Sequence, residues 1–162
     1  MKRTEDFIVE GTRLLFRNFS GREQKYNPPG KKNFCIPIED PKLANEMKKE
    51  GWNIRVLRPN EENEEPLHYM QVSLSFGDFY PPKVYMIGNI SHKKTRLNED
   101  TVAELDNVEI ESADIIIRPY NWNTPTGSGI RGYVKTLYVT YIEDVFAGKY
   151  SDYDSEVEKP FE

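Results

Sequence analysis

The sequence of 162 residues has little of what metal sites and disulfides require: it contains one cysteine, Cys35, and two histidines, His68 and His92. A single thiol cannot form a disulfide within the chain, which suits a reducing compartment. The histidines have no further ligand at metal-binding spacing, so we expect no metal site and no cofactor. Cys35 lies in an apolar stretch, where a thiol more often packs as a small hydrophobic group than acts as a nucleophile.

Long hydrophobic runs are also lacking. The first eleven residues, MKRTEDFIVEG, have no apolar segment of the kind that a signal peptide needs. No apolar run approaches the roughly 20 residues of a membrane-spanning helix. We therefore expect a cytoplasmic protein with no membrane partner.

Catalytic motifs are missing as well. Neither the histidines nor the cysteine lies in a triad motif. The glycine-rich segment GSGIRG at 127–132 lacks the Lys-Ser/Thr of a phosphate-binding loop and is interpreted as part of a hairpin turn. We predict no catalytic residues and a protein that is not an enzyme. One alternative stays open: carboxylate pairs such as Asp100 with Glu104, or Asp106 with Glu109, could bind Mg²⁺ in a nuclease.

Aromatic residues are plentiful, with ten tyrosines, eight phenylalanines and two tryptophans, and such residues favour strands. Gly11 and Thr12 could mark a bulge in the first expected strand. Turn-rich or acidic loops are expected at 20–32, 60–65 and 77–82. The apolar patterns predict strands at 7–19, 33–39, 52–59, 68–76, 83–88, 108–122 and 129–142.

One helix is predicted over 40–51. Asp40 can cap it, Pro41 fits its first turn and Gly51 fits its end. Leu43, Ala44 and Met47 form an apolar stripe at helical spacing, and a further single helical turn is expected within 98–107. Because regular alternation of strands and helices is missing, the chain is predicted to be all-β with one short helix, folded as a barrel or sandwich with long hairpins.

The charges are separated along the sequence. The segment 13–32 has six basic residues and one acid, 83–96 has four basic residues and no acid, and 118–142 has three basic residues and no acid. The acids gather elsewhere, with seven in 98–114 and five in 151–162. Each basic segment also contains aromatic residues. Single-strand binding needs this combination, because cations follow the phosphates and rings stack on bases.

These segments supply the candidate nucleic-acid-binding residues. Each of these residues also has an interpretation without nucleic acid. Basic side chains on strands commonly form a solvated face, and aromatic side chains commonly pack in the core. The predicted residues are Arg13, Arg17, Phe19, Arg22, Lys25, Tyr26, Lys31, Lys32, Lys83, Tyr85, Lys93, Lys94, Arg96, Arg118, Tyr120, Trp122, Arg131, Tyr133 and Lys135.

The end of the chain has a different composition. Residues 151–162 are acidic and carry almost no large aliphatic side chains, so we expect a disordered tail after a domain at 1–150. A terminal aromatic after acids could dock into a basic pocket of a partner. The acidic tail could also lie in the protein's own cationic groove and compete with nucleic acid, or it could be an ordinary solubilising terminus. The candidate partner-binding residues are Asp152, Asp154, Glu156, Glu158, Pro160 and Phe161.

The basic aromatic strands together with the tail DYDSEVEKPFE resemble the single-stranded-DNA-binding proteins of bacteria and bacteriophages. The stretches LLFRNFSGREQKYNPPGKKNFCIPI and GWNIRVLRP also look like small phage-encoded proteins of this type. The resemblance covers the layout of the whole chain. The tip departs from the bacterial pattern, because Glu162 follows Phe161 where that pattern ends on the aromatic residue.

The resemblance implies an oligonucleotide/oligosaccharide-binding (OB) barrel of Greek-key type at 1–150. It also implies a protein that coats exposed single strands of DNA, or of RNA, with little sequence preference. Its expected roles are replication, recombination or repair, in the host cytoplasm if a phage encodes it. The tail would recruit replication or recombination proteins, and the protein could be a homodimer. The remaining alternative is a phage-encoded acidic decoy that binds and inhibits a host protein.

Overall fold

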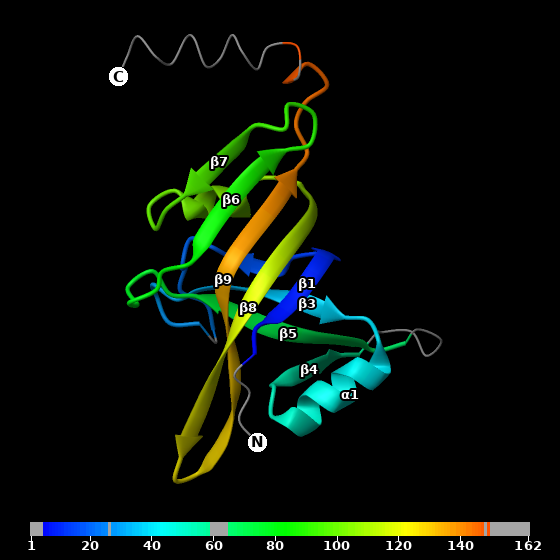
Figure 1. The fold of residues 1–162 in the computed structure, drawn as a ribbon, viewed down its shortest axis with the longest axis vertical. Helices are drawn as coiled ribbons and strands as arrows, with labels where there is room; N and C mark the ends of the chain where they lie inside the picture. Colours follow the sequence, from blue (N-terminus) through cyan, green and yellow to red (C-terminus); the bar gives the residue numbers. More distant parts are fainter. Residues whose placement is uncertain (1–4, 26, 59–64, 148, 150–162) are drawn as a thin grey trace.

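The structure is a computed structural model in which residues 5–25, 27–58, 65–147 and 149 are described. Over these residues the chain forms nine strands, one α-helix and one 3-10 helix (Figure 1). The elements in chain order are β1 (Phe7–Thr12), β2 (Leu15–Asn18), β3 (Lys32–Ile38), α1 (Pro41–Glu50), β4 (Ile54–Leu57), β5 (Leu67–Leu74), β6 (Lys83–Gly88), β7 (Lys94–Leu97), η1 (Val102–Asp106), β8 (Ile110–Thr124) and β9 (Gly127–Tyr141).

All nine strands belong to one sheet with the order β1-β8-β9-β5-β3-β2, to which β4 adds on β5 and β6 adds on β9. The two ends of this path, β1 and β2, are consecutive pieces of one bent segment. The sheet therefore curls into an OB-like barrel, although β1 and β2 share no hydrogen-bonded ladder within the described part of the chain. The prediction of an all-β fold with one short helix is confirmed.

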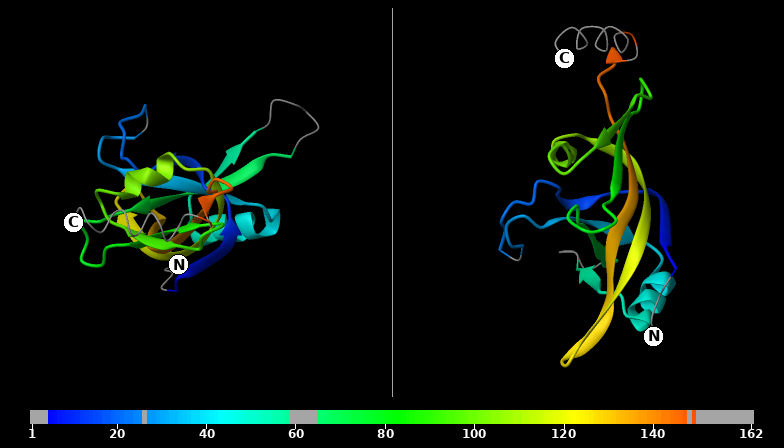
Figure 2. Two further views of the ribbon diagram at one scale, coloured as in Figure 1. Left: turned by 90° about the horizontal axis from the view of Figure 1, so that it is seen from above. Right: turned by 60° about the vertical axis from the view of Figure 1, so that its left-hand side comes forward.

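Strands β8 and β9 form the longest hairpin, paired from Ile110↔Tyr141 to the turn at Thr124↔Gly127. The other edge of β9 is divided between two neighbours. It pairs in parallel with β5 at Ser73↔Tyr133, and further along it pairs in parallel with β6 from Lys83 to Gly88. Consequently β9 contributes both to the barrel and to an extension formed by β6 and β7, while the tip of the hairpin projects from the opposite end (Figures 1 and 2).

The core lies inside the curled sheet. Phe34, Ile117 and Val134 are fully or almost fully buried there, and Trp52 is 2% exposed. Gly132 is required at the closest approach of β9 to this core. A Cβ atom on Gly132 would lie 2.9 Å from Cγ2 of Ile117 and 3.3 Å from Cζ3 of Trp52, so no larger residue fits without displacing them.

The helix prediction is confirmed by local geometry. The Asp40 side chain accepts a hydrogen bond from the backbone N–H of Lys42 at 3.0 Å, and α1 then begins at Pro41. Gly51 ends the helix with φ +124°, a conformation that favours glycine. Ala44 and Met47 are buried as expected, whereas Leu43 remains 36% exposed.

Two strand predictions needed correction. The expected strand at 7–19 is divided into β1 and β2, whereas the bulge expected at Gly11 and Thr12 is confirmed, because Gly11 has φ +60° and the pairing with β8 shifts register between Val9 and Thr12. The polar, basic segment Lys94–Leu97 was not predicted as a strand, yet it pairs with β6 as β7. Exposed basic side chains hide the alternation that would identify such an edge strand.

Candidate nucleic-acid interface

The interface is built on the face of the sheet that points away from the core. Side chains two residues apart share a face of a strand, and directly paired residues share a face of the sheet. Asn33 of β3 pairs with Ser73 of β5, Ser73 pairs with Tyr133 of β9, and Tyr133 pairs with Arg118 of β8. One row across four strands therefore carries two polar side chains, one aromatic ring and one cation.

A second row runs parallel to the first. Tyr120 of β8 pairs with Arg131 of β9, and Gln71 lies beside Arg131 because Val72 pairs with Gly132. Tyr120 is exposed, as is Arg131. The two rows together present polar and aromatic groups where the inner face of the same strands is apolar.

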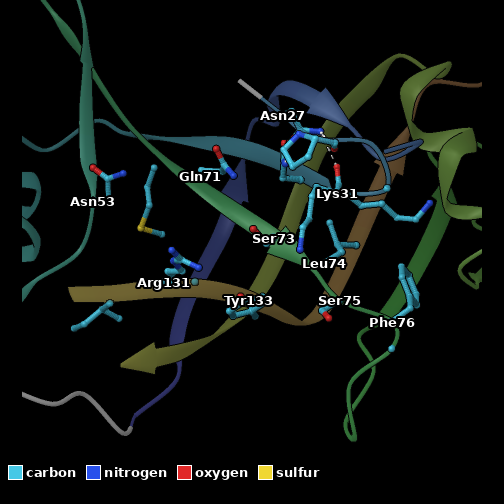
Figure 3. Close-up of a pocket in the computed structure, with 18 of the residues that line it drawn as sticks. Asn27, Lys31, Asn53, Gln71, Ser73, Leu74, Ser75, Phe76, Arg131 and Tyr133 are labelled. Carbon is cyan, nitrogen blue, oxygen red and sulfur yellow. Dashed lines mark hydrogen bonds between the residues drawn. The ribbon is translucent and has the colours of Figure 1, made fainter. Parts of the chain in front are cut away.

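A groove with a volume of about 620 Å³ lies over these rows (Figure 3). Its floor carries Gln71 and Ser73 of β5. Lys31, from the loop between β2 and β3, lies on one side, and Arg131 and Tyr133 of β9 lie on the other (Figure 3).

A second hollow of about 590 Å³ adjoins the first and shares Arg131 and Tyr133 with it. The loop between β5 and β6 supplies Phe79 and Tyr80 to its wall. The two hollows adjoin at Arg131 and Tyr133, and we call them together the groove. Phe79 is 91% exposed, an unusual position for a large apolar ring unless a ligand covers it.

Cations and rings in the groove hold one another in place. The Arg118 guanidinium lies 5.9 Å from the centre of the Tyr80 ring and donates a hydrogen bond to the Tyr80 carbonyl at 3.0 Å. The Arg131 guanidinium lies 5.8 Å from the centre of the Trp122 ring. The rings of Tyr120 and Tyr133 meet edge to face, 6.0 Å apart. Such contacts limit rotamer freedom before any ligand arrives.

The extension formed by β6 and β7 carries further residues that were predicted to bind nucleic acid. The rings of Tyr85 and Tyr138 stack 4.9 Å apart at 14°, and Lys94 lies 5.2 Å from the centre of the Tyr85 ring. Lys83 and Arg96 are exposed on the same two strands, β6 and β7, and Lys93 is exposed in the turn between them. This group lies outside the groove.

The segment 13–19 behaves differently from its prediction. Phe19 is fully buried and stacks on Phe34 with centroids 5.2 Å apart, so it cannot stack on a base. Arg17 is half-buried and donates two hydrogen bonds of 2.7 Å, to the carbonyls of Leu105 and Val108. Both residues stabilise the fold, because Phe19 packs on β3 while Arg17 binds η1 and the segment after it.

Several other predicted cations have protein partners. Lys135 forms a 2.8 Å ion pair with Asp6, and Arg13 forms a 3.8 Å ion pair with Glu39. Lys32 lines the groove while its Nζ donates to the Phe19 carbonyl at 3.2 Å. Arg22 and Lys25 are exposed in the loop between β2 and β3, and Tyr26 lies outside the described residues. The predicted tail at 151–162 lies outside them too.

Sequence reasoning missed part of the groove. Phe79 and Tyr80 were assigned only to a turn, and Arg55 and Asn53 were not considered, although all four line the groove. The adjacent aromatic pair in GDFYPP was the available signal, since exposed turns seldom need two large rings. No local signal marks Gln71, because its outward direction follows from the register of β5.

Cys35 is a buried free cysteine in β3. Burial raises the pKa of the Cys35 thiol to about 11, so it stays protonated at neutral pH, as expected for a packed side chain. Among the described residues, no three His, Cys, Asp or Glu side chains gather as metal ligands would. None of the helices in the described part is long and apolar enough to cross a membrane.

The fold and the groove define a class of protein. OB-type barrels bind oligonucleotides on the outer strand face between the loop that follows their first strand and the hairpin of their last two. Here the corresponding boundaries are the β2–β3 loop and the β8–β9 hairpin, and the face between them carries cations and rings. These are the features of a protein that binds single-stranded nucleic acid.

The family follows from the sequence. A family model described as "Putative phage ssDNA-binding domain" matches residues 1–160, and the chain belongs to that family of phage single-stranded-DNA-binding proteins. A search of curated protein sequences found no significant match.

The comparison with solved structures found single-stranded DNA-binding proteins of bacteriophages. The single-stranded DNA-binding protein from bacteriophage Enc34, in complex with ssDNA, has 12% sequence identity and a TM-score of 0.50, over 85% of this chain and 86% of that chain. The single-stranded DNA-binding protein gp2.5 of bacteriophage T7 has 11% identity and a TM-score of 0.40, over 93% of this chain and 94% of that chain. At 12% identity the Enc34 likeness bears on the fold alone.

Proposed function

We propose that the protein binds single-stranded DNA in the groove and coats exposed strands with little sequence preference. The observation that carries the proposal is that Arg118, Arg131 and Lys31 line two adjoining hollows together with the rings of Tyr120 and Tyr133. Cations bind every phosphate alike and rings stack on every base, so such a surface reads the backbone and not the sequence.

The cations and the aromatic rings of the groove would make different contacts with DNA. Lys31 and Arg131 lie on opposite sides of the floor and would bind phosphates of a DNA strand that runs between them (Figure 3). Tyr133 and Tyr120 would stack on bases, each contributing about 1–3 kcal/mol. Gln71 and Ser73 can donate or accept hydrogen bonds, which suits any base edge.

The biological role that we propose is protection of exposed strands during phage replication, recombination or repair, in the host cytoplasm. The acidic tail would attach replication or recombination proteins, with Phe161 filling a pocket of the partner. RNA could use the same contacts, because neither phosphate binding nor stacking depends on the 2′-hydroxyl. The protein would act without catalysis.

Fluorescence anisotropy with labelled oligo-dT tests the binding proposal. Affinity should fall steeply with salt, with a slope of about −0.7 in log K against log salt for each phosphate contact. Arg131→Glu should weaken binding at least about tenfold, whereas Lys48→Glu on the exposed side of α1 should have little effect. A salt-independent affinity, or equal losses for the two variants, would contradict the proposal.

The same oligonucleotide distinguishes the nuclease alternative. Binding without Mg²⁺ and without cleavage supports a coating protein. Strand cleavage that requires Mg²⁺ and disappears in Asp100→Asn would support a nuclease. Absence of nucleic-acid binding together with capture of a host protein would support the decoy.

A further inference from the structure

The outer face of the long hairpin does not end at the groove. In β8, Asp114, Ile116, Arg118 and Tyr120 alternate without interruption and share one face. Their partners in β9 are Tyr138, Thr136, Tyr133 and Arg131, in that order. The irregularity in the register leaves Lys135 as an extra residue in β9, and because of it Tyr138 and Tyr133 lie on the same face although they are five residues apart.

This face continues onto the extension. Tyr138 pairs with Tyr85 of β6, and Tyr85 pairs with Arg96 of β7. Lys83 pairs with Thr136, between the groove and the tyrosine pair. A DNA strand that leaves the groove at Tyr133 therefore meets Lys83 and then the rings of Tyr85 and Tyr138. The partners of Tyr133 and Tyr138 in β8, Arg118 and Asp114, are four residues apart, so the two tyrosines are separated by roughly 13 Å at about 3.3 Å for each residue.

We propose that the extension is a second contact site for the same DNA strand, which we call the platform: Tyr85 and Tyr138 with Lys83, Lys94 and Arg96. This inference rests on the proposed function of the groove. A base stacks on the Tyr138 ring, which is 37% exposed and has one face that Tyr85 does not cover. The three cations bind the adjoining phosphates.

Charge favours a nucleic-acid strand as the occupant. The three cations are exposed, and in the sequence 83–96 no acid interrupts them. One acid, Asp114, lies opposite Tyr138, and its Oδ1 accepts a hydrogen bond of 2.8 Å from the backbone N–H of Gly11. Asp114 opposes the bound phosphates, so its removal should strengthen binding at the platform alone.

Oligonucleotide length separates the two sites. A dT oligomer of about 5 nucleotides can occupy the groove, whereas one of about 15 nucleotides can reach the platform as well. The triple variant Lys83→Ala, Lys94→Ala, Arg96→Ala should bind the long oligomer at least about tenfold more weakly and lose roughly 2 units of its salt slope. Its affinity for the short oligomer should stay within about twofold.

Two single variants sharpen the test. Asp114→Asn keeps a hydrogen-bond acceptor for Gly11 and should raise affinity for the long oligomer only. Tyr138→Phe keeps the ring and should behave as the unaltered protein, whereas Tyr138→Ala should lose affinity for the long oligomer. Melting temperatures identify any variant that fails to fold, and photocrosslinking of a 5-iodouracil-labelled long oligomer to the unaltered protein should label Tyr85 or Tyr138.

The outcomes are separable. If the triple variant loses equal affinity for the short and the long oligomer, or loses none for either, the platform proposal is wrong. If the short oligomer binds and Arg131→Glu abolishes that binding while the platform variants change nothing, the groove stands and the platform fails. If the unaltered protein binds neither oligomer, the proposed function fails and the platform with it.

Discussion

Residues 13–19 and residues 118–133 both combine arginines with aromatic rings, but Arg17 and Phe19 lie in a different environment from Arg118 and Tyr120. In the first region Phe19 packs in the core and Arg17 binds backbone carbonyls near η1. In the second region the aromatic and cationic side chains Arg118, Tyr120 and Arg131 line the groove. The difference lies in position: the Arg17 guanidinium is directed at part-buried carbonyls near η1, whereas Arg118 and Arg131 lie along the groove.

Phe19→Ala should produce the largest change in stability. Removing a fully buried ring that stacks on Phe34 should lower the free energy of unfolding by about 3–5 kcal/mol. Urea denaturation measures the loss. Phe79→Ala is the matched control, because that ring is 91% exposed and its removal should leave stability within about 0.5 kcal/mol while weakening DNA binding. A reversed pattern would show that the two rings have been assigned to the wrong environments.

Arg17→Met and Arg131→Met form the next comparison. The first variant loses two hydrogen bonds to part-buried carbonyls and should unfold about 1–3 kcal/mol more easily, with unchanged affinity per folded molecule. The second should keep its stability and lose affinity. Paired denaturation and anisotropy measurements check both, and similar affinity losses in the two variants would mean that Arg17 also reaches the DNA.

Tyr120→Ala should cost about 1–3 kcal/mol of binding free energy if its ring stacks on a base. The ring is 54% exposed, so the melting temperature should hardly change. Tyr120→Phe, which keeps the ring, serves as the control and should bind normally. A fall in melting temperature with intact affinity would assign Tyr120 to structural packing.

Charge reversal in the β2–β3 loop should have a smaller effect. Arg22→Glu should weaken strand binding more than Lys48→Glu on α1, because Arg22 lies in the loop that borders the groove. Titrations at low salt give the greatest contrast, since screening reduces both effects at high salt. Identical losses of affinity would indicate that the overall charge of the protein, and not the position of Arg22 beside the groove, determines the effect on DNA binding.

Removing residues 151–162 should have the smallest effect on the fold and on strand binding. The deletion removes five acids and one base, a change of four in net charge. Binding at low salt should equal or slightly exceed that of the full chain, because a competing polyanion is gone. Pull-down of partner proteins should fail, and Phe161→Ala alone should reproduce that failure. Weaker strand binding after truncation would count against this role for the tail.

The helix and most strands could be predicted because their signals are local. Asp40, Pro41 and Gly51 act within one turn of the helix ends, and alternation along β5 or β6 needs only neighbouring residues. Strand β7 was missed because Lys94–Leu97 becomes a strand only by pairing with β6. The environments of Arg17 and Phe19 could not be predicted from neighbouring residues. The carbonyls that Arg17 binds, for example, lie 88 and 91 residues away in the sequence.

The sequence by itself determined that this is a β-rich chain with one capped helix and basic, aromatic segments separate from acidic ones. Those properties depend on backbone preferences and composition, which act over a few residues. Only the tertiary structure decided which cations face the groove. Strand register sets the direction of every side chain on β5, β8 and β9, and contacts between distant segments determine which charged groups are already bound.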